Sequence, residues 1–542
     1  MRKLLLLAFL LLAAVSFSQN KEAKPQVSDD LLRFSALINE AGLKQDLSVL
    51  AGPEMEGRET GMAGQRKAAA YIASRMKAIG LTPVPGLANG YEQYYFLLKE
   101  SLISAGCRWG NKDLQYGEDF IFPVAQNQSF SLKANKIFFI GYGIQDPRYS
   151  DYLPDEDYRN SILILVPGEP KIDGKYLISG TDKPGVWTQS GLKMKLEAAK
   201  KAGAAAVLLL SPNQEKISAR SIEHSKKSSR FIINNEEPEK AAYAQISHQV
   251  ARSFFGTTAM DSLISLSRSL LPLSGLPLVR RINDSIRPVE VILSLEKKTD
   301  TIKPSNVIGM LEGNRFKDEY VFITAHYDHL GIQDNKIYYG ADDDGSGTAA
   351  VLQLAAAFAK AKSAGKGPER SIVFMTVSGE EKGLLGSEYY SEHPLLPLEK
   401  TSADLNIDMI GRIDTERKLS DTNHYVYVIG HDKISTELGK ICEISNAASG
   451  NITLDYKFDD PNDPQRIYFR SDHYNFARKG VPVLFFYDGM LLGDYHKPTD
   501  TIDKINWELY VKRTRMIFTT AWNVANSDHL MQRDLPIPTM TR

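Results

Sequence analysis

Cysteine is scarce in this sequence, since Cys107 and Cys442 are the only two among 542 residues. Two cysteines so far apart give no disulfide framework, so the fold must be held by its core or by metal. The sequence leaves open whether the two pair. An excess of charge is also lacking, with a formal net charge of −1. This balance gives no electrostatic reason to expect nucleic acid or an anionic membrane as a partner.

Long apolar runs are lacking except at the N-terminus. There, two basic residues precede an unbroken apolar run from Leu4 to Val15, and small residues follow it up to Ser18. This is the pattern of a secretory signal peptide, so we expect residues 1–18 to direct export, with a periplasmic or secreted product. The run of 12 residues falls short of the roughly 20 needed to span a bilayer, which disfavours a membrane anchor and stable membrane insertion. No cysteine follows the run, which disfavours a lipid anchor.

The length of the chain and a change in its sequence pattern indicate several domains. At about 150 residues per domain, 542 residues predict two to four domains. Residues 98–280 carry short strand-like runs and a helix-like stretch, and we expect them to form a smaller inserted domain, β-rich or α/β. Residues 19–97 and 281–542 are then the two parts of the main domain.

From about residue 290 the sequence alternates between apolar runs and helical stretches. NVIGML, YVFITAH, SIVFMTV and VPVLFFYDG are typical of buried strands, and SGTAAVLQLAAAFAKAKSAG is typical of a helix. This alternation predicts an α/β fold with a mostly parallel central sheet covered by helices on both faces. Upstream, apolar residues at helical spacing predict a helix that closes at Gly80.

Polar residues that suit metal binding follow these predicted strands. His326 and Asp328 end one strand, and Glu380 and Glu381 follow another. Asp342, Asp343 and Asp344 lie in a Gly-rich loop just before the predicted helix. Asp408 follows another apolar run, and Tyr495 and His496 follow the last predicted strand. In open α/β sheets, ligands bind beyond the carboxyl ends of the strands, so these groups can converge. Clustered carboxylates and histidines would repel strongly with no cation present, and this ligand mixture suits zinc.

Each of these features has an ordinary explanation when it is taken alone. Paired glutamates are commonly the solvated start of a loop or helix, and an Asp-rich Gly loop is commonly a turn or helix cap. A lone His-x-Asp is more often a hydrogen-bonded structural pair. Their joint occurrence, in order and each after a strand, favours the functional interpretation.

Together, HYDHLG, GADDDGSG, SGEEKGLLGS, NIDMIGR and YHKPTDT resemble the co-catalytic zinc aminopeptidase family, which includes secreted bacterial leucyl-type aminopeptidases. Glutamate carboxypeptidase II and transferrin receptor are more distant relatives. The resemblance covers about residues 290–525 well and EGRETG near Gly57–Gly61 more loosely. Through GYGIQD and KAGAAAVLLLSP, the segment 98–280 is similar to a protease-associated domain. The resemblance implies a zinc-exopeptidase fold and an exported aminopeptidase that acts on peptide substrates.

The resemblance also implies two Zn²⁺ ions per chain. The expected ligands are His326 and Asp408 for one ion, Glu381 and His496 for the other, and Asp343 as the bridge. It further implies a cis peptide bond between Asp343 and Asp344.

Other residues of the expected site act beside the ions. Asp328 is expected to hydrogen-bond the far nitrogen of His326. Glu380 is expected to be the general base. The resemblance places Tyr495 near the developing oxyanion and Arg470 of FRSDHYNF near the substrate.

Three other functions stay open at this point. A carboxypeptidase of the glutamate carboxypeptidase type would call for a cluster of arginines in the substrate pocket, which the sequence does not locate. A mononuclear acyltransferase of the glutaminyl-cyclase type would lack the second-metal pair, whereas His326 and Asp408 are both present. A non-catalytic, receptor-like homologue would lack metal ligands, and none is missing here.

Overall fold

The structure is a computed structural model of the chain. It describes residues 28–87, 90–123, 127–189, 192–219, 221–222, 225, 230–233, 241–286, 288–418, 420–421 and 423–539. The predicted signal peptide, residues 1–18, lies outside these residues. Across the described part of the chain, no helix combines the length and the apolar character needed to cross a bilayer.

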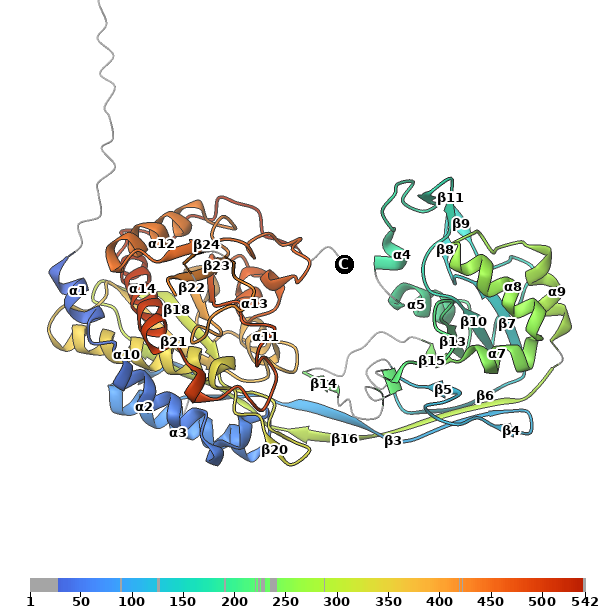
Figure 1. Ribbon diagram of the computed structural model, residues 1–542, viewed down its shortest axis with the longest axis horizontal. Helices are drawn as coiled ribbons and strands as arrows, with labels where there is room; N and C mark the ends of the chain where they lie inside the picture. Colours follow the sequence, from blue (N-terminus) through green and yellow to red (C-terminus); the bar gives the residue numbers. More distant parts are fainter. Residues whose placement is uncertain are drawn as a thin grey trace, which may run out of the picture.

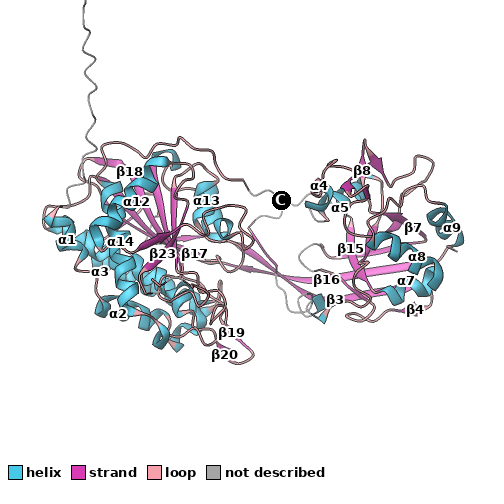
Figure 2. Ribbon diagram, turned by 45° about the horizontal axis from the view of Figure 1, so that its top comes forward, coloured by secondary structure: helices cyan, strands magenta, loops and turns pink. Residues whose placement is uncertain are grey.

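Two lobes make up the described chain, and two long paired strands join them. Figure 1 shows β3 (Leu97–Trp109) and β16 (Val291–Ile302) running from one lobe to the other. The pair is antiparallel, from Ile302 opposite Leu97 to Val291 opposite Trp109. Figure 2 shows the same two strands bridging the lobes from a second direction.

The first lobe is built on one large mixed sheet. Its strand order is β1-β17-β21-β18-β22-β25-β23-β24, and β2 also pairs with β17. The central strands β21, β18, β22 and β25 are parallel, as predicted, while β17 and β23 add to them in antiparallel pairings. The strands are β1 (Thr82–Pro83), β2 (Glu92–Tyr94), β17 (Ser305–Leu311), β18 (Phe316–His326), β21 (Arg370–Val377), β22 (Thr401–Ile407), β23 (Tyr425–Ile429), β24 (Thr453–Asp455) and β25 (Val483–Tyr487).

Alternation along the strands divides their side chains between two hydrophobic cores. In β21, Ile372 and Phe374 belong to one core, and Val373 and Met375 belong to the other. The helices whose residues join the first core are α1 (Asp29–Ser35), α2 (Glu40–Leu50), α3 (Ala63–Ile79), α10 (Gly347–Ser363), α12 (Thr436–Ser449) and α14 (Trp507–Ala525). The shorter helices α11 (Leu385–Glu392) and α13 (His473–Ala477) contribute to the second core. The continuous apolar runs therefore form a sheet that is covered on both faces, as predicted.

The helix predicted upstream of the sheet is α3. Its buried residues include Ala69, Ile72 and Met76, which recur at helical spacing. Gly80 caps the helix with φ 93°, a left-handed conformation that glycine adopts without a steric penalty. The predicted end of this helix is therefore confirmed.

The second lobe has a hydrophobic core of its own, which draws on residues from Cys107 to Leu295. One of its sheets has the order β5-β15-β13-β10-β7, and another has the order β14-β3-β16-β6, with β4 paired to β3. The strands are β4 (Lys112–Asp113), β5 (Phe120–Ile121), β6 (Phe130–Ala134), β7 (Lys136–Gly141), β10 (Ser161–Leu165), β13 (Ala206–Leu210), β14 (Arg230–Ile232) and β15 (Ala242–Ile246). The helices include α4 (Val186–Gln189), α5 (Lys193–Lys201), α7 (His248–Phe255), α8 (Thr257–Arg268) and α9 (Pro277–Ser285).

The two cysteines do not pair. Cys107 lies in the core of the second lobe and Cys442 in the core of the first, and both are buried free thiols. Burial raises the pKa of each thiol to about 12. Both side chains therefore act as small apolar residues.

We expect Phe358→Ala to lower the free energy of unfolding of the first lobe by about 3–5 kcal/mol, the usual cost of truncating a buried phenylalanine. Phe358 is fully buried, and its ring centroid lies 4.4 Å from that of Phe518 and 5.9 Å from that of Trp522. Urea denaturation followed by tryptophan fluorescence measures the change. Lys360→Ala, an exposed position on the same helix, is the matched control and should change stability by less than about 0.5 kcal/mol.

Candidate metal centre

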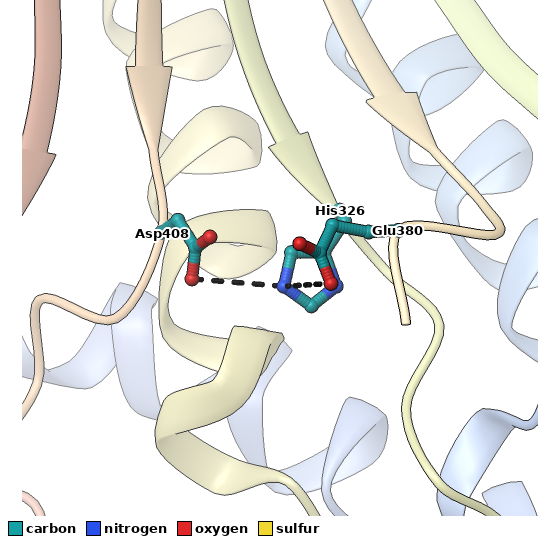
Figure 3. Close-up of side chains that lie close together, drawn as sticks. All are labelled: His326, Glu380 and Asp408. Atoms are coloured by element: carbon teal, nitrogen blue, oxygen red, sulfur yellow. Dashed lines mark ion pairs between the residues drawn. The ribbon is translucent and has the colours of Figure 1, made fainter. Parts of the chain in front are cut away.

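The predicted site residues meet where the central parallel strands end. His326 is the last residue of β18, Glu380 follows β21, and Asp408 follows β22. In Figure 3, dashed lines join one nitrogen of the His326 ring to the carboxylates of Asp408 and Glu380. The ring nitrogen Nε2 lies 3.6 Å from Asp408 Oδ1 and 3.9 Å from Glu380 Oε2. The convergence predicted from the strand ends is therefore present in the fold.

Asp343 lies between two histidines. Its Oδ1 is 3.2 Å from Nε2 of His326, and its Oδ2 is 3.2 Å from Nε2 of His496. The carboxylate is almost fully buried, with 4% of the side chain exposed. One carboxylate therefore presents a different oxygen to each histidine, which is the arrangement of a bridging ligand.

The neighbouring aspartates of this loop are occupied by backbone amides. Asp342 Oδ1 accepts the N–H of Gly411 at 2.8 Å, and Asp344 Oδ1 accepts the N–H of Met409 at 3.0 Å. The peptide bond between Asp343 and Asp344 is cis, as predicted. Of the three aspartates in this loop, the middle one is thus directed toward the histidines.

Asp500, in the YHKPTDT motif, binds the backbone of the aspartate loop. Asp500 accepts the backbone N–H groups of Asp342, at 3.0 Å, and of Asp343, at 3.1 Å. Burial raises the pKa of Asp500 to about 6. The final motif of the chain therefore positions the backbone of the bridging aspartate.

Glu381 and His496 form the second part of the site. Glu381 Oε2 lies 3.0 Å from His496 Nε2, and Glu381 Oε1 lies 2.8 Å from Nδ1 of His329. His329 is a site residue that the sequence interpretation missed. The signal available was the second histidine of HYDHLG, three residues after His326.

Asp328 lies beside His326, but its carboxylate oxygens accept hydrogen bonds from other groups. The Nδ1 of His326 lies 3.0 Å from the backbone carbonyl of Asp328 and 3.7 Å from its Oδ1. The carboxylate accepts the backbone N–H of Glu380 at 3.2 Å and the hydroxyl of Thr60 at 2.6 Å. The backbone carbonyl of Asp328 thus accepts the hydrogen bond from Nδ1 of His326, while the Asp328 side chain positions the SGEE turn.

The two adjacent glutamates have opposite electrostatic environments. Burial raises the pKa of Glu380 well above its usual range, and the nearby Glu381 carboxylate raises it further. Burial and Asp343 act against ionisation of Glu381, but contacts with His329 and His496 lower its pKa to about 2. Glu381 is therefore held as a carboxylate, which is the form that binds a metal, and Glu380 is the better proton acceptor.

Several buried atoms of the site make no hydrogen bond. They are His326 Nε2, His329 Nδ1 and Nε2, Asp343 Oδ2 and Glu381 Oε1. Buried polar atoms are normally satisfied, so a cluster of orphaned nitrogen and carboxylate atoms needs an explanation. Ligand atoms at about 2.0–2.2 Å from one tetrahedral zinc ion stand roughly 3.3 Å apart, close to the 3.0–3.6 Å separations around His326 and His496. The donor set therefore fits zinc.

Tyr495 and Arg470 line the pocket that opens onto these groups. The Arg470 guanidinium donates to the Tyr495 hydroxyl at 3.2 Å, and the Tyr495 ring stacks on His496 with centroids 3.8 Å apart. Burial and the nearby carboxylates raise the pKa of Tyr495, so its hydroxyl stays protonated. The remaining wall of the pocket is mainly apolar, with Met409, Ile467, Phe485, Tyr487 and Leu491.

Arg58, from EGRETG, is a second residue that the sequence interpretation missed. Its guanidinium is fully buried and donates to the backbone carbonyls of Tyr327 at 2.7 Å, Tyr339 at 2.8 Å and Gly340 at 2.8 Å. It also donates to Leu50 at 2.6 Å. Arg58 thereby ties the segment that carries His326 to the loop that carries the aspartates.

We expect Arg58→Met to destabilise the first lobe by about 3–5 kcal/mol, because several buried carbonyls lose their donor. Arg58→Lys should recover only part of this loss, since an ammonium cannot span the same carbonyls. Thermal and urea unfolding of the zinc-free and zinc-loaded proteins measure both effects. Arg66→Met is the control, because Arg66 donates to Gly61 from an exposed position. A stable Arg58→Met protein would show that the guanidinium does not organise the site.

Comparison with known families agrees with this geometry. Residues 306–521 match the model of peptidase family M28. The chain is 29% identical over 213 residues to a probable leucine aminopeptidase of Arthroderma otae, covering 38% of this chain and 55% of that protein. It is 29% identical over 214 residues to aminopeptidase YwaD of Bacillus subtilis, covering 38% of this chain and 41% of that protein. The chain thus spans about half the length of these curated relatives.

Among solved structures, an aminopeptidase from Aneurinibacillus sp. strain AM-1 is similar to this chain. The TM-score is 0.55 at 17% sequence identity, and the match covers 94% of this chain and 99% of that one. A likeness at this identity shows the fold alone. The predicted α/β zinc-exopeptidase fold is confirmed, and the resemblance predicted for residues 290–525 is confirmed over 306–521.

Proposed function

Since residues 306–521 match the model of peptidase family M28, we propose that the protein is a zinc-dependent exopeptidase that removes the N-terminal residue of peptides. The observation that carries this proposal is the Asp343 carboxylate, with one oxygen 3.2 Å from His326 and the other 3.2 Å from His496. A mononuclear site would not need a carboxylate that faces two separate histidines. The same geometry argues against a receptor-like protein without catalysis.

We propose that two zinc ions share the bridge of Asp343. His326 and Asp408 would hold one ion, and Glu381 and His496 would hold the other. When bound, the two ions would polarise the scissile carbonyl and lower the pKa of the attacking water.

Glu380 acts as the general base in this proposal. Its side chain lines the pocket beside His326 but keeps 13% of its surface exposed, so it can reach a substrate. Burial raises its pKa, which makes it a stronger proton acceptor than an ordinary glutamate. It takes the proton from the attacking water and passes it to the leaving amine.

Tyr495 donates its hydroxyl proton toward the developing oxyanion. The hydrogen bond from Arg470 fixes the direction of this hydroxyl, and the stack on His496 fixes the ring. Such preorganised donors stabilise the transition state because they need no reorientation during the reaction. Arg470 faces the pocket as well and contacts substrate in this proposal.

The pocket favours an aminopeptidase over a carboxypeptidase. A carboxypeptidase would need several arginines to bind a terminal carboxylate, and Arg470 is the one arginine among the described residues that line this pocket. Its apolar wall suits the side chain of an apolar N-terminal residue. Rates on aminoacyl substrates should therefore exceed rates on N-blocked peptides, and the reverse order would favour a carboxypeptidase.

We also propose the location and the domain organisation of the protein. The apolar run within residues 1–18 supports export by a cleaved signal peptide, with a periplasmic or secreted product. The separate core of the second lobe supports an inserted protease-associated-like domain at 98–280, between the peptidase segments 19–97 and 281–542.

The zinc-free protein should be inactive, and activity should return with two equivalents of zinc per chain. This follows from ligands that complete two sites only when Asp343 is shared. Dialysis against a chelator, followed by titration with zinc and a rate assay, measures the stoichiometry. Full activity at one equivalent, with no gain from a second, would support a mononuclear enzyme.

Glu380→Gln and Glu381→Gln should give different phenotypes. Glu380→Gln removes the base and leaves the ligands intact, so kcat should fall by about 10²–10⁴-fold with both zinc ions still bound. Glu381→Gln should weaken one zinc ion, since a neutral amide is a poorer ligand than a carboxylate. Excess zinc should restore part of the activity of Glu381→Gln and none of that of Glu380→Gln.

Zinc content and kcat, measured on the same preparations, test this pair. Swapped phenotypes would mean that the two roles are reversed. If neither substitution affected the rate, the hydrolase proposal would fail.

A further inference from the structure

His329 is buried against the second part of the site, yet neither of its ring nitrogens makes a hydrogen bond. Its position is set by the backbone, because its N–H donates to the carbonyl of Arg58 at 3.3 Å. Gly340 packs on the ring so closely that a Cβ at this glycine would lie 2.5 Å from Cγ of His329. The chain thus accommodates a fully buried imidazole with no aligned hydrogen bond at either ring nitrogen.

The ring faces the two carboxylates expected to bind the second ion. Nδ1 of His329 lies 2.8 Å from Glu381 Oε1 and 3.7 Å from Asp343 Oδ2. The nearer contact is short but is not aligned as a hydrogen bond, and both of its atoms remain unpartnered. Ligand atoms point at their shared metal and not at one another, so close but misaligned pairs are characteristic of a metal site.

His329, Asp343 and Glu381 also meet the basic requirement for a cation site. One ligand atom from each lies within 4.8 Å of the others. His496 approaches the same carboxylates from another direction, with its ring centroid 5.9 Å from that of His329 and the rings at 71°. Both imidazoles therefore contact the same two carboxylates, His329 at Oε1 of Glu381 and His496 at Oε2.

We propose that His329 is a further zinc ligand, which binds the second ion through Nδ1 together with Asp343, Glu381 and His496. This inference rests on the proposed function, because it assumes that the second ion is bound. It makes the two ions unequal: the first would have one histidine ligand, and the second would have two. The second position would then be the more closed of the two, since its protein ligands alone can complete a tetrahedral site.

The alternative is that His329 binds no zinc and only orients Glu381, by donating a hydrogen bond from Nδ1 to Oε1 of Glu381. The two roles differ in what can replace the imidazole. A side-chain amide can donate a hydrogen bond but is a poor zinc ligand, so His329→Gln separates orientation from ligation.

Zinc binding to the purified full-length protein tests the proposal without an activity assay. Isothermal titration of the apoprotein with zinc should show two binding events in the wild type. The event assigned to the second ion should weaken by at least about 100-fold in both His329→Ala and His329→Gln, beyond the usual 10–100-fold cost of losing an orienting partner. His473→Leu is the matched control, since His473 is also buried with both ring nitrogens unpartnered; it should retain both events.

A crystal structure of the zinc-loaded wild type gives the direct readout. A zinc ion at about 2.0–2.1 Å from Nδ1 of His329 is expected. Two bound ions with His329 out of contact with both, or a His329→Gln protein that binds two ions as tightly as the wild type, would overturn the inference and leave the proposed function intact. A wild type that binds no zinc would refute the proposed function itself.

Discussion

Many carboxylates are buried at the carboxyl ends of the central strands, and the rest of the structure depends on how they are stabilised. Buried negative charges are stable only when they are paired or hydrogen-bonded. The chain binds at least one oxygen of most of them through its own amide and hydroxyl groups. Amide groups bind Asp342, Asp344 and Asp500, while hydroxyl groups bind Asp328 and Asp408. The carboxylates of Asp343 and Glu381 are instead matched by imidazoles. Asp408 has both kinds of partner, since its Oδ1 also lies 3.6 Å from Nε2 of His326. The carboxylates that face an imidazole are therefore the ones suited to zinc, and those bound only by amides are structural.

Positive charge in the region is distributed so that it does not compete for the site. Arg58 is fully buried near Asp343, yet its donors are taken by backbone carbonyls and not by carboxylates. It contributes a favourable field without forming an ion pair that would block a ligand atom. His496 behaves differently, because Asp343 and Glu381 raise its pKa to about 10 against the opposing effect of burial. Its nitrogen therefore lies in a negative potential of the kind that attracts a cation.

Adjacent glutamates can take different roles because the turn after β21 separates their surroundings. Glu381 points toward the histidines, whereas Glu380 lines the pocket. The amide of Glu380 is fixed by Asp328, which is fixed in turn by Thr60 from the distant EGRETG segment. The position of the proposed base thus depends on the loop before α3, which is distant in the sequence from the strands that carry the ligands but contacts Asp328 in the fold.

Local patterns in the sequence determined the buried strands, the helix ending at Gly80, and the order of the polar motifs, because apolar periodicity and capping act over a few residues. The sequence also marked the middle aspartate of GADDDGSG, through the family resemblance. It could not show that Arg58 crosses to Tyr327 and Gly340, or that His329 lies 2.8 Å from Glu381. Nor could it separate Cys107 and Cys442 into different cores. These features depend on distances between segments that only packing brings together, and no local pattern encodes such distances.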